Sequence, residues 1–189
     1  TAYATREVIL CAGAFNTPQL LMLSGIGPAM DLNAHDIPVR VDLPGVGRNL
    51  QDRYEVPVVN RMNFPQWRVF RGAHFAQNDP LFRKWQRFRQ GPYITNGGVL
   101  AAFRRSFADK ETPDIFCLAL LGLFRGYFPK YSELFAKNLN YMTWVVLKAH
   151  TNNSAGRITL RSADPRDPPN VNFHYFEEGN DLRGEDIAA

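Results

Sequence analysis

Residues 13–27 read GAFNTPQLLMLSGIG and directly follow a short apolar run, EVILCA, at residues 7–12. An apolar run of this length is typical of a strand that is buried on both faces of a sheet. Thr17 and Pro18 favour the start of a helix, with Thr17 as its N-cap and Pro18 in the first helical position. We therefore predict a buried strand, a turn of small residues and a short apolar helix over residues 19–23.

The residues that follow continue the same organisation. A second short helix is predicted between Gly27 and Ala34, and a strand is predicted over residues 37–41. The Pro and Gly content of residues 43–47 indicates a turn. Together these elements are expected to form the tail of an α/β unit that ends near Asp52.

Beyond that point the pattern changes to short alternating or continuous apolar segments, which are typical of strands. Residues 141–149 alternate, and the turn at residues 152–156 predicts a hairpin with residues 157–161. Residues 81–88 place apolar side chains on one helical face and basic ones around the rest. The expected fold class is therefore mixed α+β and α/β, with a mostly antiparallel sheet and flanking helices in its second part. Further strands are predicted at residues 54–60, 99–103, 115–124 and 171–176.

The composition limits the classes of protein that the chain can represent. Its 189 residues are 45% apolar and 21% charged, an ordinary globular balance that argues against disorder. The net charge of +4 is compatible with anionic ligands but does not require a nucleic acid. Cys11 and Cys117 lack the spacing of a disulfide scaffold or zinc site, so we expect two buried free thiols and no metal. The longest apolar run, residues 115–124, is too short to cross a bilayer, which takes about 20 residues.

Three segments together resemble one known family. Residues 13–27 resemble the second signature of the glucose–methanol–choline (GMC) oxidoreductases throughout the pattern, including the closing Ser-Gly-Ile-Gly. Residues 44–52, PGVGRNLQD, are similar to the family's turn between its flavin and substrate domains. Residues 154–160, SAGRITL, are similar to its substrate-domain hairpin. The resemblance is sharp over about the first 53 residues and the last 50 residues. It implies that the chain is a fragment of a family member similar to choline dehydrogenase.

The resemblance implies a fold and an activity. Residues 1–53 would be the C-terminal part of a Rossmann-like domain that binds FAD, and residues 54–189 would be the substrate-binding domain. Family members oxidise the CH–OH group of an alcohol by hydride transfer to the flavin. The substrate would be a choline-like, aliphatic, aromatic or sugar alcohol, and the electron acceptor would be oxygen or another molecule.

The resemblance also implies cofactor-binding residues. Small residues at the end of a strand allow the backbone to approach a ligand closely, and a following helix N-terminus favours anions. We therefore expect Ala12, Gly13 and Ala14, and less strongly Thr17, to lie beside FAD. The alternative is that these small residues only allow helix and sheet to pack together.

Three departures from the family pattern limit what can be transferred. The chain contains no G-x-G-x-x-G turn, which in the family holds the FAD pyrophosphate. The family's catalytic His is expected beyond the last residue of this chain, so no catalytic residue is assigned. Arg53 stands where many members carry His.

Other functions were weighed against this hypothesis. The basic and aromatic residues 83–89 suit an amphipathic helix better than a nucleic-acid site, so no nucleic-acid partner is expected. In the layout that the resemblance implies, this helix would cover the substrate site or a membrane-facing or partner-facing surface. The remaining alternatives are a non-catalytic ligand-binding or interaction module built on the antiparallel sheet, and a nicotinamide-dependent Rossmann enzyme. No secretory leader is recognised, and a cytoplasmic or membrane-associated location is expected.

Overall fold

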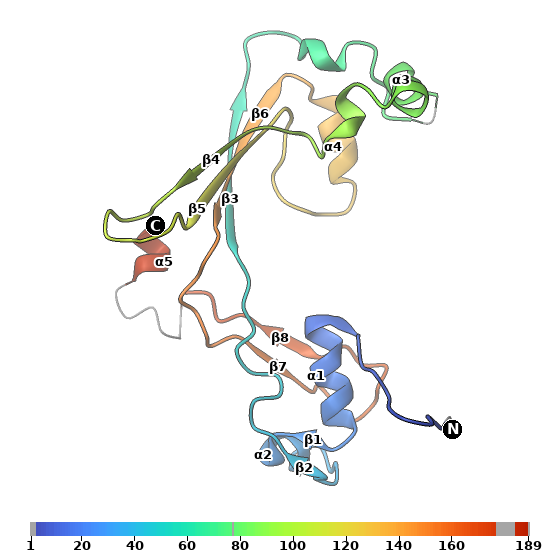
Figure 1. Ribbon diagram of the computed structural model, residues 1–189, viewed down its shortest axis with the longest axis vertical. Coiled ribbons are helices and arrows are strands. Elements are labelled where there is room, and N and C mark those ends of the chain that lie inside the picture. Colours follow the sequence, from blue (N-terminus) through green and yellow to red (C-terminus); the bar gives the residue numbers. More distant parts are fainter. Residues whose placement is uncertain (1–2, 77, 177–183, 189) are drawn as a thin grey trace. The chain divides into compact units, whose positions relative to one another are not determined.

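The computed structural model describes residues 3–76, 78–176 and 184–188 (Figure 1). The described residues form two compact units, of which unit 1 comprises Thr1–Asp52 and Thr151–Ala188 and unit 2 comprises Arg53–His150. Unit 1 therefore combines the N-terminal segment with residues 151–176 and 184–188. The predicted division into a domain over residues 1–53 and a domain over residues 54–189 stays a prediction. The roles of residues 1–53 in FAD binding and of residues 54–189 in substrate binding stay predictions.

Unit 1 is a small mixed assembly around one apolar core. A parallel pair joins β1 to β2, and an antiparallel pair joins β7 to β8. The core brings Met22 and Leu32 from the N-terminal segment against Ile158 and Leu160 from the C-terminal segment. Its elements are α1 (Gly13–Leu23), β1 (Ile26–Gly27), α2 (Ala29–Asn33), β2 (Val41–Asp42), β7 (Arg157–Thr159), β8 (Asn170–Asn172) and α5 (Glu185–Ala188).

The start of unit 1 differs from its prediction in two ways. Residues 7–12 lie outside any strand, since no strand among the described residues pairs with them, and residues 7–11 are exposed. Helix α1 begins at Gly13, six residues before the predicted start, and Pro18 lies inside it. Thr17 is therefore not the N-cap. Its hydroxyl instead accepts a hydrogen bond from the backbone N–H of Ala12, which ties the chain before the helix to its second turn.

The predicted hairpin between residues 141–149 and 157–161 is wrong. Both edges of β6 (Tyr141–Lys148) are occupied by other strands of unit 2, so it has no free edge for β7. β7 pairs instead with β8, across the proline-rich loop at residues 164–169. Cys11 is exposed and Cys117 half-buried, so the expectation of two buried thiols is also wrong.

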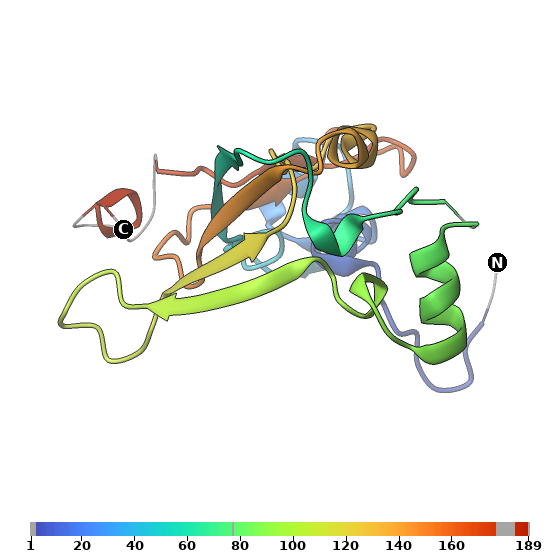
Figure 2. The same ribbon diagram turned by 90° about the horizontal axis from the view of Figure 1, so that it is seen from above.

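Unit 2 contains the antiparallel sheet that the sequence predicts, with the strand order β3-β6-β5-β4. Figure 2 shows the twist of this sheet, with the helices gathered toward one of its ends. The predicted strand over residues 115–124 ends at Leu120, and the remaining residues form a loop. The mixed fold class with an antiparallel sheet and flanking helices is confirmed. Besides β6, the elements are β3 (Tyr54–Arg61), η1 (Arg68–Phe70), α3 (Pro80–Phe88), η2 (Pro92–Ile94), β4 (Gly98–Arg104), β5 (Ile115–Leu120) and α4 (Tyr131–Lys137).

Candidate functional site

The four residues predicted to contact a cofactor lie at the N-terminus of α1. Ala12 is the N-cap residue, and no side chain caps the helix. Gly13 has a φ of +82°, and a Cβ atom placed on it would meet nothing within 4 Å. Gly13 and Ala14 are exposed, while Ala12 and Thr17 are half-buried and hydrogen-bonded to each other over 3.0 Å. The structure thus brings all four residues together around one helix end.

This helix end has the chemistry of an anion-binding site. The first N–H groups of a helix have no carbonyl partner within it, and the helix dipole places partial positive charge there. Since no side chain caps α1 and the space around Gly13 is open, a phosphate or a polar ring edge could approach these N–H groups. The exposed small residues therefore fit a dinucleotide at this position.

The other two family-like segments meet within unit 1. The N–H of Ile158 donates to the carbonyl of Gly47 over 2.7 Å, and the N–H of Leu50 donates to the carbonyl of Gly156 over 2.9 Å. A Cβ atom on Gly47 would lie 2.2 Å from the carbonyl oxygen of Ile158. A Cβ atom on Gly156 would lie 2.0 Å from that of Leu50. Both glycines are required because two backbone segments touch, so the turn and the hairpin segment form one interlocked structure.

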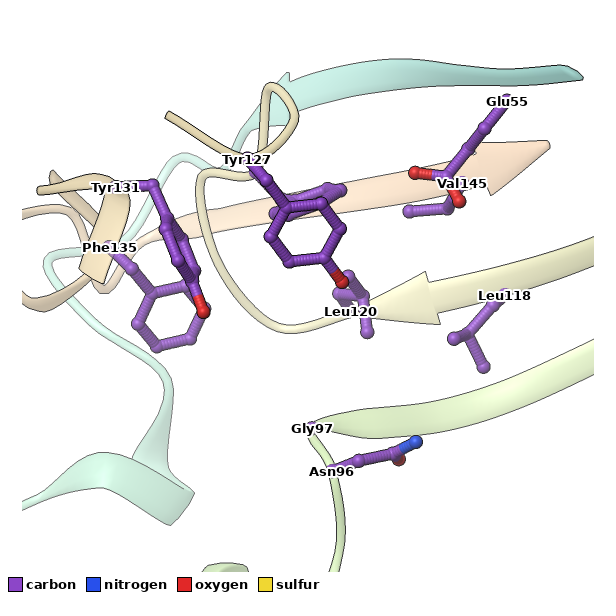
Figure 3. Close-up of a pocket in the computed structure, with 10 residues that line it drawn as sticks. Glu55, Asn96, Gly97, Leu118, Leu120, Tyr127, Tyr131, Phe135 and Val145 are labelled. Atoms are coloured by element: carbon purple, nitrogen blue, oxygen red, sulfur yellow. The ribbon is translucent and has the colours of Figure 1, made fainter. Parts of the chain in front are cut away.

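A pocket of about 290 Å³ lies within unit 2, over one face of its sheet. Its floor is apolar, because the facing residues Leu118 and Val145 lie opposite each other on β5 and β6. Its wall is aromatic, with Tyr127 and Tyr131 at a ring separation of 5.3 Å. Glu55 is the acidic residue that lines it. In the view of Figure 3, the ring of Tyr127 lies between the ring of Tyr131 and the carboxylate of Glu55.

Buried polar contacts hold the aromatic wall in place. Thr143 is fully buried on β6, and its hydroxyl donates to the carbonyl of Gly122 over 2.7 Å. The same hydroxyl accepts from the N–H of Phe124 over 3.1 Å. A Cβ atom on Gly122 would lie 1.8 Å from the ring of Phe135, so glycine is needed for that ring to pack there. The loop that carries Tyr127 is thereby fixed at its first residues.

Unit 2 also buries an ion pair that does not line the pocket. Lys148 donates to the carboxylate of Asp114, which also accepts from the N–H and hydroxyl of Ser106. Burial raises the pKa of the Asp114 carboxyl, but the hydrogen bonds from Lys148 and Ser106 outweigh it and hold that pKa well below its usual value. Because both charges are paired and hydrogen-bonded, the cluster stabilises the end of the sheet.

A second buried carboxylate organises the start of α3. Asp79 accepts from the N–H groups of Leu81 and Phe82, as an N-cap does, and also from those of His74 and Phe75. Its fifth donor is the hydroxyl of Tyr93. Burial and the contact with Asp79 raise the pKa of Tyr93 to about 12. Tyr93 therefore acts as a hydrogen-bond donor at neutral pH.

The described residues show neither a metal site nor a membrane-spanning helix. No group of three or more His, Cys, Asp or Glu side chains in the described ranges could hold a metal ion. Among the helices described, none has both the length and the apolar character needed to span a bilayer.

Comparison with known proteins identifies the family. Residues 1–55 match the family model described as GMC oxidoreductase. The chain is 37% identical over 183 residues to an oxygen-dependent choline dehydrogenase of Brucella anthropi. The matched region covers 96% of this chain and 32% of that protein. This chain belongs to the GMC oxidoreductase family. It spans only about a third of the length of the curated relatives it matches.

Solved structures of GMC-type enzymes resemble the chain over nearly its whole length. A structure of a formate oxidase variant of Aspergillus oryzae RIB40, which concerns the effect of a mutation on FAD modification, is 29% identical to this chain. Its TM-score is 0.76, over 98% of this chain and 36% of that one. An FAD-dependent oxidoreductase of Chaetomium thermophilum is 26% identical with a TM-score of 0.57, over 90% of this chain and 34% of that one. The family resemblance expected from residues 13–27 is thus confirmed.

The sequence prediction missed the pocket in unit 2. A signal was present, because Tyr127, Tyr131 and Phe135 are spaced four residues apart, as on one face of a helix. Only Tyr131 and Phe135 are in α4, and Tyr127 precedes it. No pattern in the sequence connects these residues with Glu55, which lies on β3, more than 70 positions earlier.

Proposed function

We propose that the chain is part of an FAD-dependent oxidoreductase that oxidises the CH–OH group of a small alcohol, with a choline-like cation as the preferred substrate. The observation that carries this proposal is the 37% identity to a choline dehydrogenase over 96% of the chain. The pocket of unit 2 supports the choice of substrate. Because the chain spans a third of its relatives, the activity is proposed for the full-length protein.

The N-terminus of α1 is the proposed contact with the flavin. Ala12, Gly13 and Ala14 present backbone atoms with little side chain in the way, and the N–H groups after Gly13 would donate to a polar or anionic part of the cofactor. Thr17 would hold the backbone of Ala12 in place rather than bind the cofactor itself. When bound, FAD supplies the hydride-accepting chemistry.

The pocket of unit 2 is the proposed site for the substrate cation. A quaternary ammonium group cannot donate hydrogen bonds, so aromatic faces and a carboxylate recognise it best. Tyr127 and Tyr131 offer such faces, and Glu55 offers the negative charge. The apolar floor formed by Leu118 and Val145 suits the methyl groups that surround the charge.

These residues position the substrate and do not carry the proton transfer. The hydroxyl proton must leave as the carbinol carbon gives up its hydride, and this requires a base near the reacting carbon. No residue of this chain is assigned to that role. The described residues would therefore determine which alcohol binds, through charge and shape, and where its hydroxyl end lies.

The test uses the full-length protein and two alcohols of nearly the same shape. Choline and its neutral analogue 3,3-dimethylbutan-1-ol differ chiefly in the positive charge. We expect the purified protein to release FAD on denaturation, and choline to reduce the bound flavin anaerobically. We expect kcat/KM for choline to exceed that for the neutral analogue about tenfold or more, given the strength of cation–π and carboxylate contacts.

Glu55→Gln should reduce this preference, while the matched variant Glu133→Gln should preserve it, because Glu133 is an exposed acid of α4 outside the pocket lining. A protein without flavin would overturn the proposed activity. A flavin reduced equally well by both alcohols would overturn only the choice of substrate. Oxygen uptake, compared with reduction of an artificial dye, identifies the acceptor.

A further inference from the structure

Positive charge is concentrated in one part of unit 2. Residues 56–108 contain nine Arg or Lys residues and a single acidic residue, Asp79, whereas the whole chain has a net charge of only +4. Asp79 has no exposed surface and its carboxylate is saturated with hydrogen bonds. Even with the charge of Asp79 counted, residues 56–108 keep a net positive charge of +8.

Helix α3 lies within this basic region and contacts little else. None of its residues is buried, and both views place it beyond the end of the sheet (Figures 1 and 2). Arg83, Lys84 and Arg87 are exposed along it, and Arg89 follows at its C-cap. These four cations form no ion pair with any residue that the structure describes. We refer to residues 80–89 as the basic helix segment.

Aromatic side chains lie among these cations. Phe82 stacks on Trp85 with ring centroids 5.4 Å apart, and the guanidinium of Arg89 lies 4.7 Å from the centre of the Trp85 ring. Phe88 is 56% exposed, with the guanidinium of Arg87 5.2 Å from its ring centre. Exposing a Phe ring to water is unfavourable, so this surface is suited to a contact that buries the ring.

We propose that the basic helix segment docks the protein on an anionic membrane surface. A short helix with Arg and Lys beside Trp and Phe is the composition of interfacial helices, whose cations meet lipid phosphates while the rings enter the headgroup boundary. The segment lies on the surface and does not cross the bilayer, in keeping with its nine helical residues.

The arrangement of the rings favours a lipid surface over a nucleic acid. Binding of single-stranded nucleic acid needs aromatic faces on which bases can stack. The Trp85 ring is already in contact with Phe82 and with the guanidinium of Arg89. Lipid headgroups require only accessible cations and an apolar edge, and Arg83, Lys84 and Phe88 supply both.

Sedimentation of the full-length protein with vesicles tests this proposal. Vesicles of phosphatidylcholine alone are compared with vesicles containing roughly one third phosphatidylserine, which carry a negative surface potential. We expect binding to the anionic vesicles and little binding to the neutral ones. The triple variant Arg83→Gln/Lys84→Gln/Arg87→Gln should bind about 100-fold more weakly, because each cation near such a surface contributes roughly fivefold.

A control triple variant, Arg61→Gln/Arg104→Gln/Arg125→Gln, removes the same charge from exposed positions of unit 2 outside the segment. It should keep most of the binding. Phe88→Ser should weaken binding to anionic vesicles without changing its salt dependence. Equal loss in the two triple variants would show a general charge effect and overturn the proposal, as would absent vesicle binding. Tight binding of a single-stranded oligonucleotide without vesicle binding would instead assign the segment to nucleic acids.

Discussion

Unit 1 and unit 2 differ in the kind of contact that stabilises each of them internally. In unit 1, Gly47 and Gly156 allow two stretches of backbone to touch directly. In unit 2, the corresponding links are buried polar side chains, namely Asp79, Asp114 and Thr143, each with at least two hydrogen-bond partners. These contacts in unit 1 require glycines, which have no side chain, whereas the contacts named in unit 2 are made by polar side-chain atoms.

The two kinds of contact tolerate different amino-acid substitutions. A Cβ atom on residue 47 would lie 2.2 Å from the carbonyl oxygen of Ile158, so the backbone contact requires glycine at this position. Such a requirement marks the sequence with a glycine that can be recognised. A buried carboxylate can be replaced together with its partner by apolar residues, sometimes without loss of stability. Two of the three family-like segments, residues 44–52 and 154–160, contain these glycine contacts and lie in unit 1.

The largest expected effect comes from breaking the buried ion pair in unit 2. Asp114→Asn leaves the ammonium group of Lys148 buried without its counter-charge, so we expect a loss of about 3–5 kcal/mol in the free energy of unfolding. Denaturant unfolding of the full-length protein measures it. Asp109→Asn is the matched control, because Asp109 is exposed in the same loop.

The ion pair between Asp114 and Lys148 also makes the free energy of unfolding depend on pH. The folded-state pKa of Asp114 lies well below its usual value, so the unfolded chain takes up this proton first as the pH falls. The contribution of Asp114 is therefore complete above its ordinary pKa of about 4 and declines as the pH falls toward the lower, folded-state pKa. The stability gap between wild type and Asp114→Asn should narrow at about pH 3 relative to neutral pH. A gap that widens on acidification would contradict this account.

The next effect tests the backbone contact of unit 1. Gly47→Ala places a methyl group against the carbonyl of Ile158 and forces a residue with a side chain into a φ of +77°. We expect a loss of about 3 kcal/mol, measured by denaturant unfolding. Gly45→Ala, in the same turn, adds a methyl group that meets nothing within 4 Å. It should change stability by no more than about 0.5 kcal/mol. Similar losses in the two variants would disprove the interlocked backbone.

Much of the fold could be predicted from local patterns in the sequence. The strands near residues 54–60, 99–103 and 141–149 were predicted almost at their observed bounds, because alternation or apolar runs mark them. The pairing of residues 157–161 with β8 was not predicted, because alternation with a period of two identifies a strand but not the strand that pairs with it. Residues 7–12 carry a strand pattern, yet the described residues provide them with no neighbouring strand.

The candidate site could be predicted only in part. Gly13 and its neighbours were found because a family signature covers them, and the structure adds the open space around Gly13. Asp114 and Lys148 were not predicted as a pair because they are 34 residues apart in the sequence and meet only through the pairing of β5 with β6.

The smallest expected effect concerns the link between Thr143 and the pocket. Thr143→Val keeps the shape of the side chain but leaves the N–H of Phe124 and the carbonyl of Gly122 without their buried partner. We expect a loss of about 1–2 kcal/mol in the free energy of unfolding. Because the loop that carries Tyr127 starts from these two residues, KM for choline should rise while kcat changes little. Thr143→Ser lacks the methyl group but retains the hydroxyl, so it should keep KM close to that of the wild type. If KM rises as much in Thr143→Ser as in Thr143→Val, retention of the hydroxyl is not sufficient to hold the aromatic wall, and the proposed role of these hydrogen bonds is wrong.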